Sequence, residues 1–300
     1  MSENEKQEVV AMTELAPILD VRTVLGEGPI WDNGRQLLHW VDILGGTLYT
    51  FDPISGEDRA SDVGQLVSTV APWRGDEVMV TVSQGFASFN LATGVLCLIH
   101  DPEEHLPGNR FNDGKCDPAG RFWAGTMASE DPSDQGSLYC MGTDLRVRKV
   151  MGGIGIANGI TWSLDHETMY YIDTVRADVR AYDYDVDSGE IANERVVITF
   201  PDGVGVPDGM DIDEEGMLWI AHFGGGRVCR WDPGRGKILD TIHLPASRTT
   251  SCTFGGREFD TLYVTSAGGP GGVLVGGDPA GGLFALKPGV RGVPSFRFGG

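Results

Sequence analysis

The sequence has few basic residues and few cysteines. Lysine occurs only at Lys6, Lys115, Lys149, Lys237 and Lys287, and the formal net charge is −20. This charge repels phosphate backbones and anionic lipid surfaces, which argues against nucleic acid or a membrane as a partner. The 5 cysteines are scattered and never spaced as C-x-x-C, which argues against a zinc knuckle or a disulfide framework. We therefore expect buried thiols in a cytoplasmic protein.

Long apolar runs and helical periodicity are also absent. No stretch approaches the roughly 18 apolar residues of a membrane span. The polar, acidic start of the chain lacks the apolar core of a secretory signal. We predict a polar N-terminal segment over residues 1–15 and a single domain over residues 16–300, and we expect the protein to be a monomer.

Glycine is abundant, with 44 residues, and the apolar runs are short and rich in β-branched and aromatic side chains. This combination is typical of short strands joined by tight turns. Residues 37–43 and 47–52 form one such pair of runs, and residues 217–223 and 227–232 form another. The sequence therefore predicts an all-β protein with few helices.

An internal repeat organises these runs. Four segments pass from a polar residue through a turn bearing Asp or Ser into a strand: GEGPIWDNGRQLLHWVD from Gly26, NDGKCDPAGRFWAGT from Asn112, NGITWSLDHETMYYIDT from Asn158 and DGMDIDEEGMLWIAH from Asp208. Two further units, marked by Ala71 and Thr253, bring the count to six units of about 45 residues, a period typical of propeller blades. The repeat predicts a six-bladed β-propeller, in which residues 16–24 are placed to supply the outer strand of the last blade.

Four oxygen-bearing side chains occupy the same position in four of the units: Glu27, Asn112, Asn158 and Asp208. In a propeller such positions converge on the central channel. Two negative charges placed together there would be costly without a cation. The repeat therefore predicts a site for one hard divalent ion. Calcium, magnesium and manganese suit oxygen ligands, and zinc and iron(II) stay open.

Around these positions the sequence resembles the family of senescence marker protein, regucalcin and gluconolactonase. The matching motifs are LGEGPIWD (25–32), RFNDGKCDPAGRFWAGTM (110–127), ANGITWSLDHETMYYIDT (157–174), PDGMDIDEEGMLWIA (207–221) and TTSCTFGG (249–256). They cover nearly the whole chain in order. The likeness is greatest to the animal regucalcin type, which hydrolyses aldonolactones.

The resemblance implies a role for each candidate residue. Three residues would ligate the cation, with calcium as the first choice: Glu27, Asn158 and Asp208. Asp208 would also act as general base. Three residues would contact the substrate: Arg110, Asn112 and Glu130. The implied activity is hydrolysis of a sugar lactone such as gluconolactone or gulonolactone, with the cation as Lewis acid.

Three other functions stay open at this point. A metal that activates water beside an open channel does not choose between carbonyl and phosphorus, so a phosphotriesterase-like hydrolase is the nearest rival. A calcium-binding regulator without turnover and a propeller used only as an interaction platform are the others. Residues 183–194 nearly reproduce an EF-hand loop, but Ser188 stands where that loop needs glycine. We predict a β-hairpin there.

Overall fold

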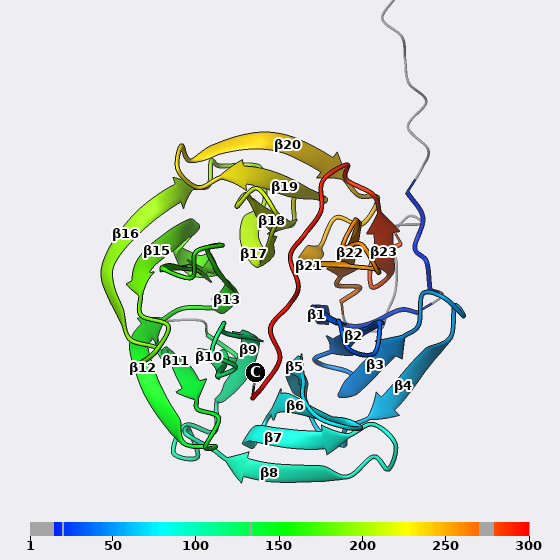
Figure 1. Ribbon diagram of the computed structural model, residues 1–300, viewed down its shortest axis with the longest axis vertical. Helices are drawn as coiled ribbons and strands as arrows, with labels where there is room; N and C mark the ends of the chain where they lie inside the picture. The colour runs from blue at the N-terminus through cyan, green and yellow to red at the C-terminus, as the bar shows by residue number, and fades with distance from the viewer. Residues whose placement is uncertain (1–14, 20, 132–133, 270–278, 300) are drawn as a thin grey trace, which may run out of the picture.

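The computed structural model describes residues 15–19, 21–131, 134–269 and 279–299, and it confirms the six-bladed β-propeller. Six sheets surround a central axis, and each strand pairs antiparallel with its neighbours in the sheet (Figure 1). Residues 1–14 of the predicted N-terminal segment lie outside the described residues.

The first three blades follow one another along the chain. Blade 1 contains β1 (Gly26–Asp32), β2 (Leu37–Asp42), β3 (Thr47–Phe51) and β4 (Asp58–Asp62). Blade 2 contains β5 (Val67–Pro72), β6 (Glu77–Val82), β7 (Gly85–Asn90) and β8 (Leu96–His100). Blade 3 contains β9 (Asn109–Cys116), β10 (Phe122–Ala128), β11 (Gly136–Met141) and β12 (Val147–Ile154).

The second half of the ring has the same order. Blade 4 contains β13 (Ala157–Trp162), β14 (Thr168–Asp173), β15 (Asp178–Tyr184) and β16 (Ile191–Thr199). Blade 5 contains β17 (Val206–Ile212), β18 (Leu218–Phe223), β19 (Arg227–Asp232) and β20 (Lys237–His243). Blade 6 contains β21 (Thr249–Gly255), β22 (Thr261–Ser266) and β23 (Leu283–Leu286). Within the described ranges the helical element is η1 (Thr174–Arg176), and no helix there has the length and apolarity that a membrane span needs.

The core lies between the blades. The innermost strands β1 and β13 are almost entirely buried, whereas the outermost strands β4, β8 and β20 are largely exposed. Each of six apolar clusters joins two adjacent blades. Trp31 of blade 1, for example, stacks on Tyr263 of blade 6 with ring centroids 5.9 Å apart. Burial between blades therefore stabilises the ring as a whole.

Both ends of the described chain contact distant blades. Ile18 N donates to Leu283 O at 2.8 Å and Thr23 N to Gly281 O at 3.0 Å, so this segment runs beside β23 without forming a regular strand in the described residues. The C-terminal segment, red in Figure 1, crosses the centre of the ring. Its Phe298 N donates to Pro72 O at 2.9 Å.

The cysteines are free thiols. The prediction that they are buried is correct for Cys116, Cys140, Cys229 and Cys252, and it is wrong for Cys97. Cys97 lies on β8, the outermost strand of blade 2, where its neighbour Leu98 is exposed as well.

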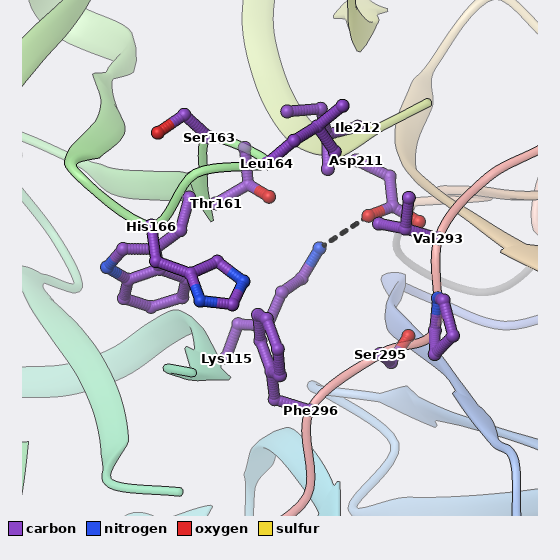
Figure 2. A pocket seen from close by; sticks show the side chains of 12 residues that line it. Lys115, Thr161, Ser163, Leu164, His166, Asp211, Ile212, Val293, Ser295 and Phe296 are labelled. Atoms are coloured by element: carbon purple, nitrogen blue, oxygen red, sulfur yellow. Dashed lines mark hydrogen bonds and ion pairs between the residues drawn. The ribbon is translucent and has the colours of Figure 1, made fainter. Parts of the chain in front are cut away.

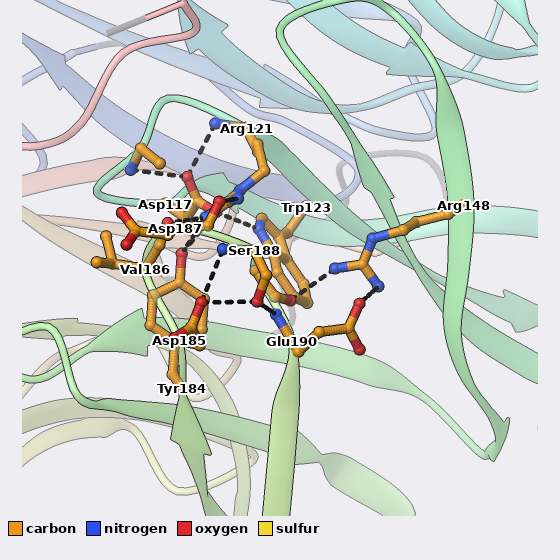
Figure 3. A network of polar contacts seen from close by, with 12 residues as sticks. Asp117, Arg121, Trp123, Arg148, Tyr184, Asp185, Val186, Asp187, Ser188 and Glu190 are labelled. Atoms are coloured by element: carbon orange, nitrogen blue, oxygen red, sulfur yellow. Dashed lines mark hydrogen bonds and ion pairs between the residues drawn. The ribbon is translucent and has the colours of Figure 1, made fainter.

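A buried carboxylate joins blade 3 to blade 4 (Figure 3). Asp117 is 0% exposed and accepts hydrogen bonds from Arg121 Nε at 2.6 Å, Trp123 Nε1 at 2.9 Å and Tyr184 Oη at 2.7 Å. Arg121 also donates to backbone carbonyls of the turn that joins β15 and β16. That turn closes a β-hairpin, as predicted, and it is part of this contact between blades.

Replacing Asp117 by asparagine should destabilise the protein by about 3 kcal/mol, because the Arg121 charge then stays buried without its counter-ion. Urea unfolding of the variant and the wild type measures the difference. Asp187→Asn is the matched control, since Asp187 is exposed on the neighbouring hairpin. Equal losses in both variants would contradict this account of Asp117.

Candidate functional site

A β-bulge interrupts each innermost strand near its start. The register of pairing shifts directly after Glu27 in β1 and directly after Asn158 in β13, and the shift in β17 spans Asp208. The same irregularity occurs in β5, β9 and β21. A bulge bends the strand and re-aims its side chains. The bulges therefore take these polar residues out of the regular in-and-out alternation of the strand.

Close packing of the inner strands explains why glycine follows Asn158 and Asp208. A Cβ on Gly159 would lie 2.8 Å from the carbonyl oxygen of Asp208, and a Cβ on Gly209 would lie 2.0 Å from Oγ of Ser251. Only glycine fits at such distances. The Asn-Gly and Asp-Gly pairs of the repeat are thus a packing requirement as well as a pattern, whereas Gly28 after Glu27 has φ +52°, which favours glycine.

Glu27 and Asp208 lie together and are 4% and 6% exposed. Burial, followed by the charge of Asp113, raises the pKa of Glu27 to about 8, and the Arg110 charge opposes this rise. Burial, followed by the charge of Glu27, raises the pKa of Asp208 well above its usual range. Two such carboxylates retain a proton unless a positive charge neutralises them.

Asn158 is the third member of this group. It is 4% exposed, and its amide lies close enough to Asp208 to oppose the rise in the pKa of that carboxyl. In the described part of the chain, Asn158 Oδ1 and Asp208 Oδ1 are buried without a hydrogen-bond partner. An unpaired buried polar atom costs about 1–3 kcal/mol. Hard divalent cations prefer oxygen ligands of this kind, so the two atoms fit such an ion.

The composition of this set distinguishes it from a histidine or cysteine centre. Among the residues that the structure describes, no three His, Cys, Asp or Glu side chains form a metal-binding group. Glu27, Asn158 and Asp208 instead offer two carboxylates and one amide oxygen. Two negative charges match one divalent cation, and water or substrate oxygen atoms would complete its coordination.

Asn112 occupies the equivalent position of blade 3, but its amide is already engaged. Nδ2 donates to Ala157 O at 2.8 Å, and Oδ1 accepts from Arg110 Nη1 at 2.7 Å. The Arg110 guanidinium in turn interacts with the charges of Glu27 and Asp208, which oppose the lowering of its pKa by burial. The structure therefore brings Arg110 and Asn112 to the site as one hydrogen-bonded unit.

Glu130 does not join them. It is exposed on a bend beyond β10. A cavity of about 310 Å³ lies beside Arg110, and its described lining does not include Glu130. That lining does include Glu103, which is buried and accepts from Thr126 Oγ1 at 3.0 Å and Tyr139 Oη at 2.9 Å. Glu103 lies outside the aligned motifs, so the repeat gave no signal for it.

Sequence analysis also missed Asp113. This residue stands directly after Asn112, at the place that glycine occupies in blades 1, 4 and 5. Burial raises its pKa, and the Lys115 charge opposes the rise. Its own charge raises the pKa of both Glu27 and Asp208. The sequence signal that could have identified Asp113 is that it breaks the pattern of a polar residue followed by glycine.

The other ends of the inner strands carry an ion pair beside a mainly apolar cavity (Figure 2). Asp211 lies three residues beyond Asp208 on β17, about 10 Å along the strand. Lys115 Nζ donates to Asp211 Oδ1 at 3.2 Å and to Met210 O at 2.9 Å. These residues line a mainly apolar cavity of about 230 Å³, which residues 293–296 of the C-terminal segment also line. The charges here pair with each other, and the candidate site lies nearer the starts of the strands.

The molecule is thus a six-bladed propeller with two buried carboxylates, a buried amide oxygen and a half-buried guanidinium around its axis. A family model described as SMP-30/Gluconolactonase/LRE-like region matches residues 25–268. The chain belongs to this family, which confirms the resemblance seen in the sequence. Membership supports a lactonase function.

Individual relatives agree with this assignment. The chain is 42% identical to regucalcin of Gallus gallus over 284 residues, which cover 92% of this chain and 95% of the relative. It is 42% identical over 248 residues to YvrE of Bacillus subtilis (strain 168), provisionally named a sugar lactone lactonase, with 83% and 85% covered. The crystal structure of a regucalcin from Agrobacterium tumefaciens, described as a calcium-binding protein, matches with a TM-score of 0.88 at 30% identity, covering 95% of this chain and 98% of that one.

Proposed function

We propose that this protein hydrolyses a small sugar lactone with one divalent cation held by Glu27, Asn158 and Asp208. The observation that carries the proposal is the pair of unpartnered, buried oxygen atoms, Asn158 Oδ1 and Asp208 Oδ1, beside the Glu27 carboxylate in the described chain. The family description and the name of the Bacillus subtilis relative support the lactone as substrate. Calcium is the first choice of cation, because the Agrobacterium tumefaciens relative is described as calcium-binding.

A bound cation would act as a Lewis acid toward the lactone carbonyl. The protein's own groups do the rest. Asp208 would accept the proton of the attacking water at its carboxylate and return it to the ring oxygen as the lactone C–O bond breaks. Glu27 would remain ionised to keep the cation in place. No covalent nucleophile is needed for this hydrolysis.

Arg110 and Asn112 would hold the substrate. Arg110 Nη1 donates to Phe111 O at 2.8 Å and to Asn112 Oδ1 at 2.7 Å, which fixes the guanidinium and leaves its other N–H groups for the substrate oxygen atoms. Positioning of this kind can contribute up to about 7–11 kcal/mol to lowering a barrier. Glu130, exposed and outside the described lining of the cavity beside Arg110, is left out of this substrate-binding pair.

Lactone hydrolysis tests the proposal directly. Gluconolactone opening, followed by the acid it releases, should require a divalent cation: treatment with EDTA should abolish it and calcium should restore it. Calcium binding without lactone turnover would favour the regulatory protein instead. Turnover that survives removal of all metal would contradict the proposed site.

Asn112→Ala should separate substrate contact from cation binding. Because the Asn112 amide bonds to Arg110 and Ala157, its loss should lower kcat/KM on the order of 10- to 1000-fold while calcium affinity is retained. Calorimetry measures the affinity and initial rates measure the efficiency. A collapse of calcium affinity would make Asn112 a metal ligand.

A further inference from the structure

Side-chain hydrogen bonds link each inner strand to the next around much of the ring. In three blades the residue equivalent to Glu27 donates to the carbonyl that precedes the equivalent residue of the following blade. These bonds run from Thr250 Oγ1 to Gly26 O (2.6 Å), from Ser68 Oγ to Phe111 O (2.7 Å) and from Asn112 Nδ2 to Ala157 O (2.8 Å). In blades 1 and 5 this position is a carboxylate, which has no proton to donate when ionised.

Blade 4 makes the corresponding link through an additional residue. Thr174, the first residue of η1, donates its hydroxyl to Pro207 O at 2.8 Å, directly before Asp208. The same hydroxyl accepts from Asn158 Nδ2 at 2.8 Å. Asn158 therefore reaches the next blade through Thr174 and does not use its own amide for that contact.

This chain of bonds determines which way the Asn158 amide faces. A backbone carbonyl such as Pro207 O only accepts, so the Thr174 hydroxyl must donate to it. The hydroxyl oxygen is then left to accept, and the group it accepts from must be the NH₂ of Asn158. The amide oxygen consequently lies on the other side, where Asn158 Oδ1 has no partner among the described residues.

A comparison of blades 1 and 4 shows why only blade 4 needs a hydroxyl group to orient its polar side chain. Asp42 in blade 1 and Asp173 in blade 4 both accept from backbone N–H groups of the turn that precedes the inner strand. The next residue is Ile43 in blade 1 and Thr174 in blade 4. The Glu27 carboxylate of blade 1 presents an oxygen atom in either orientation. An amide presents either an oxygen atom or a repelling N–H group.

We infer that Thr174 is a positioning residue that presents Asn158 Oδ1 to the divalent cation and couples β13 to the strand that carries Asp208. The inference rests on the proposed function, because it requires a cation at that site. Partners of this kind, which orient a metal ligand without touching the metal, typically contribute 10- to 100-fold in affinity. The role belongs to the Thr174 hydroxyl, since the backbone N–H of Thr174 donates to Ile156 O and its carbonyl accepts from Ala177 N.

Calcium titration calorimetry on the full chain tests the inference without relying on catalysis. Thr174→Val, which keeps the shape and removes the hydroxyl, should weaken calcium binding 10- to 100-fold. Thr174→Ser, which keeps the hydroxyl, should bind calcium close to the wild-type affinity. If the valine variant does not fold, Thr174→Ala removes the same hydroxyl with a smaller side chain.

Ser68→Ala is the matched control, since it removes an equivalent link between blades that touches no proposed cation ligand. Its calcium affinity should stay at the wild-type value. Unchanged affinity in Thr174→Val, or an equal loss in Ser68→Ala, would overturn the role of Thr174. A wild-type protein that binds no divalent cation would overturn the proposed function and this inference with it.

Discussion

Asp208→Asn is expected to lower kcat for gluconolactone on the order of 100- to 10,000-fold even at saturating calcium, the range for loss of a general base. The substitution keeps the shape of the side chain and one oxygen atom that can bind the cation. It removes the negative charge and the group that accepts the proton. The charge contributed by Glu27 and residue 208 changes from −2 to −1, which should also weaken calcium binding. Initial rates measured over a calcium titration separate the two effects.

Asp211→Asn provides the matched control for this experiment. Asp211 lies on the same strand and is also 6% exposed, but it pairs with Lys115 away from the proposed chemistry. Folded Asp211→Asn protein should keep a kcat near the wild-type value. Recovery of Asp208→Asn to the wild-type rate at high calcium would show that Asp208 is a ligand only, and Glu27 would become the candidate base.

The metal-free protein should lose stability as the pH rises from about 5 to about 8. Burial raises the pKa of Glu27 from 4.5 to about 8, so within this window the folded state holds a proton that the unfolded chain has lost. The stabilising effect is complete below the unfolded pKa and is lost as the pH passes the folded one. Each unit of difference corresponds to about 1.4 kcal/mol, so the loss is on the order of several kcal/mol.

Thermal unfolding in EDTA across this pH range measures the effect, and Glu27→Gln isolates it because glutamine does not titrate. The wild-type Tm should fall more steeply with pH than the Tm of the variant. Saturating calcium should flatten the wild-type profile, since the cation replaces the proton and binds more tightly as the pH rises. Parallel profiles for the two metal-free proteins would refute the shifted pKa of Glu27.

The repeat alone was sufficient to predict the six blades and the equivalence of Glu27, Asn112, Asn158 and Asp208. The reason is physical: each blade is one supersecondary unit, and the same turn and the same packing recur at the same place in each. The glycine after Glu27, Asn158 and Asp208 was visible in the sequence. Its cause became visible only in the fold: Gly159 and Gly209 contact the next inner strand, and Gly28 has a positive φ.

The tertiary structure decided how these equivalent residues differ. Asn112 and Asn158 have the same side chain at the same position, yet Asn112 Oδ1 accepts from Arg110 while Asn158 Oδ1 has no partner in the described chain. An amide takes its orientation from the donors and acceptors around it. Asn112 is oriented by Arg110 on its own strand and by Ala157 O of the next blade, and Asn158 is oriented by Thr174 of η1. The raised pKa of Glu27 likewise depends on burial and on the charge of Asp113, which lies on β9 two blades away and comes close only in the folded ring.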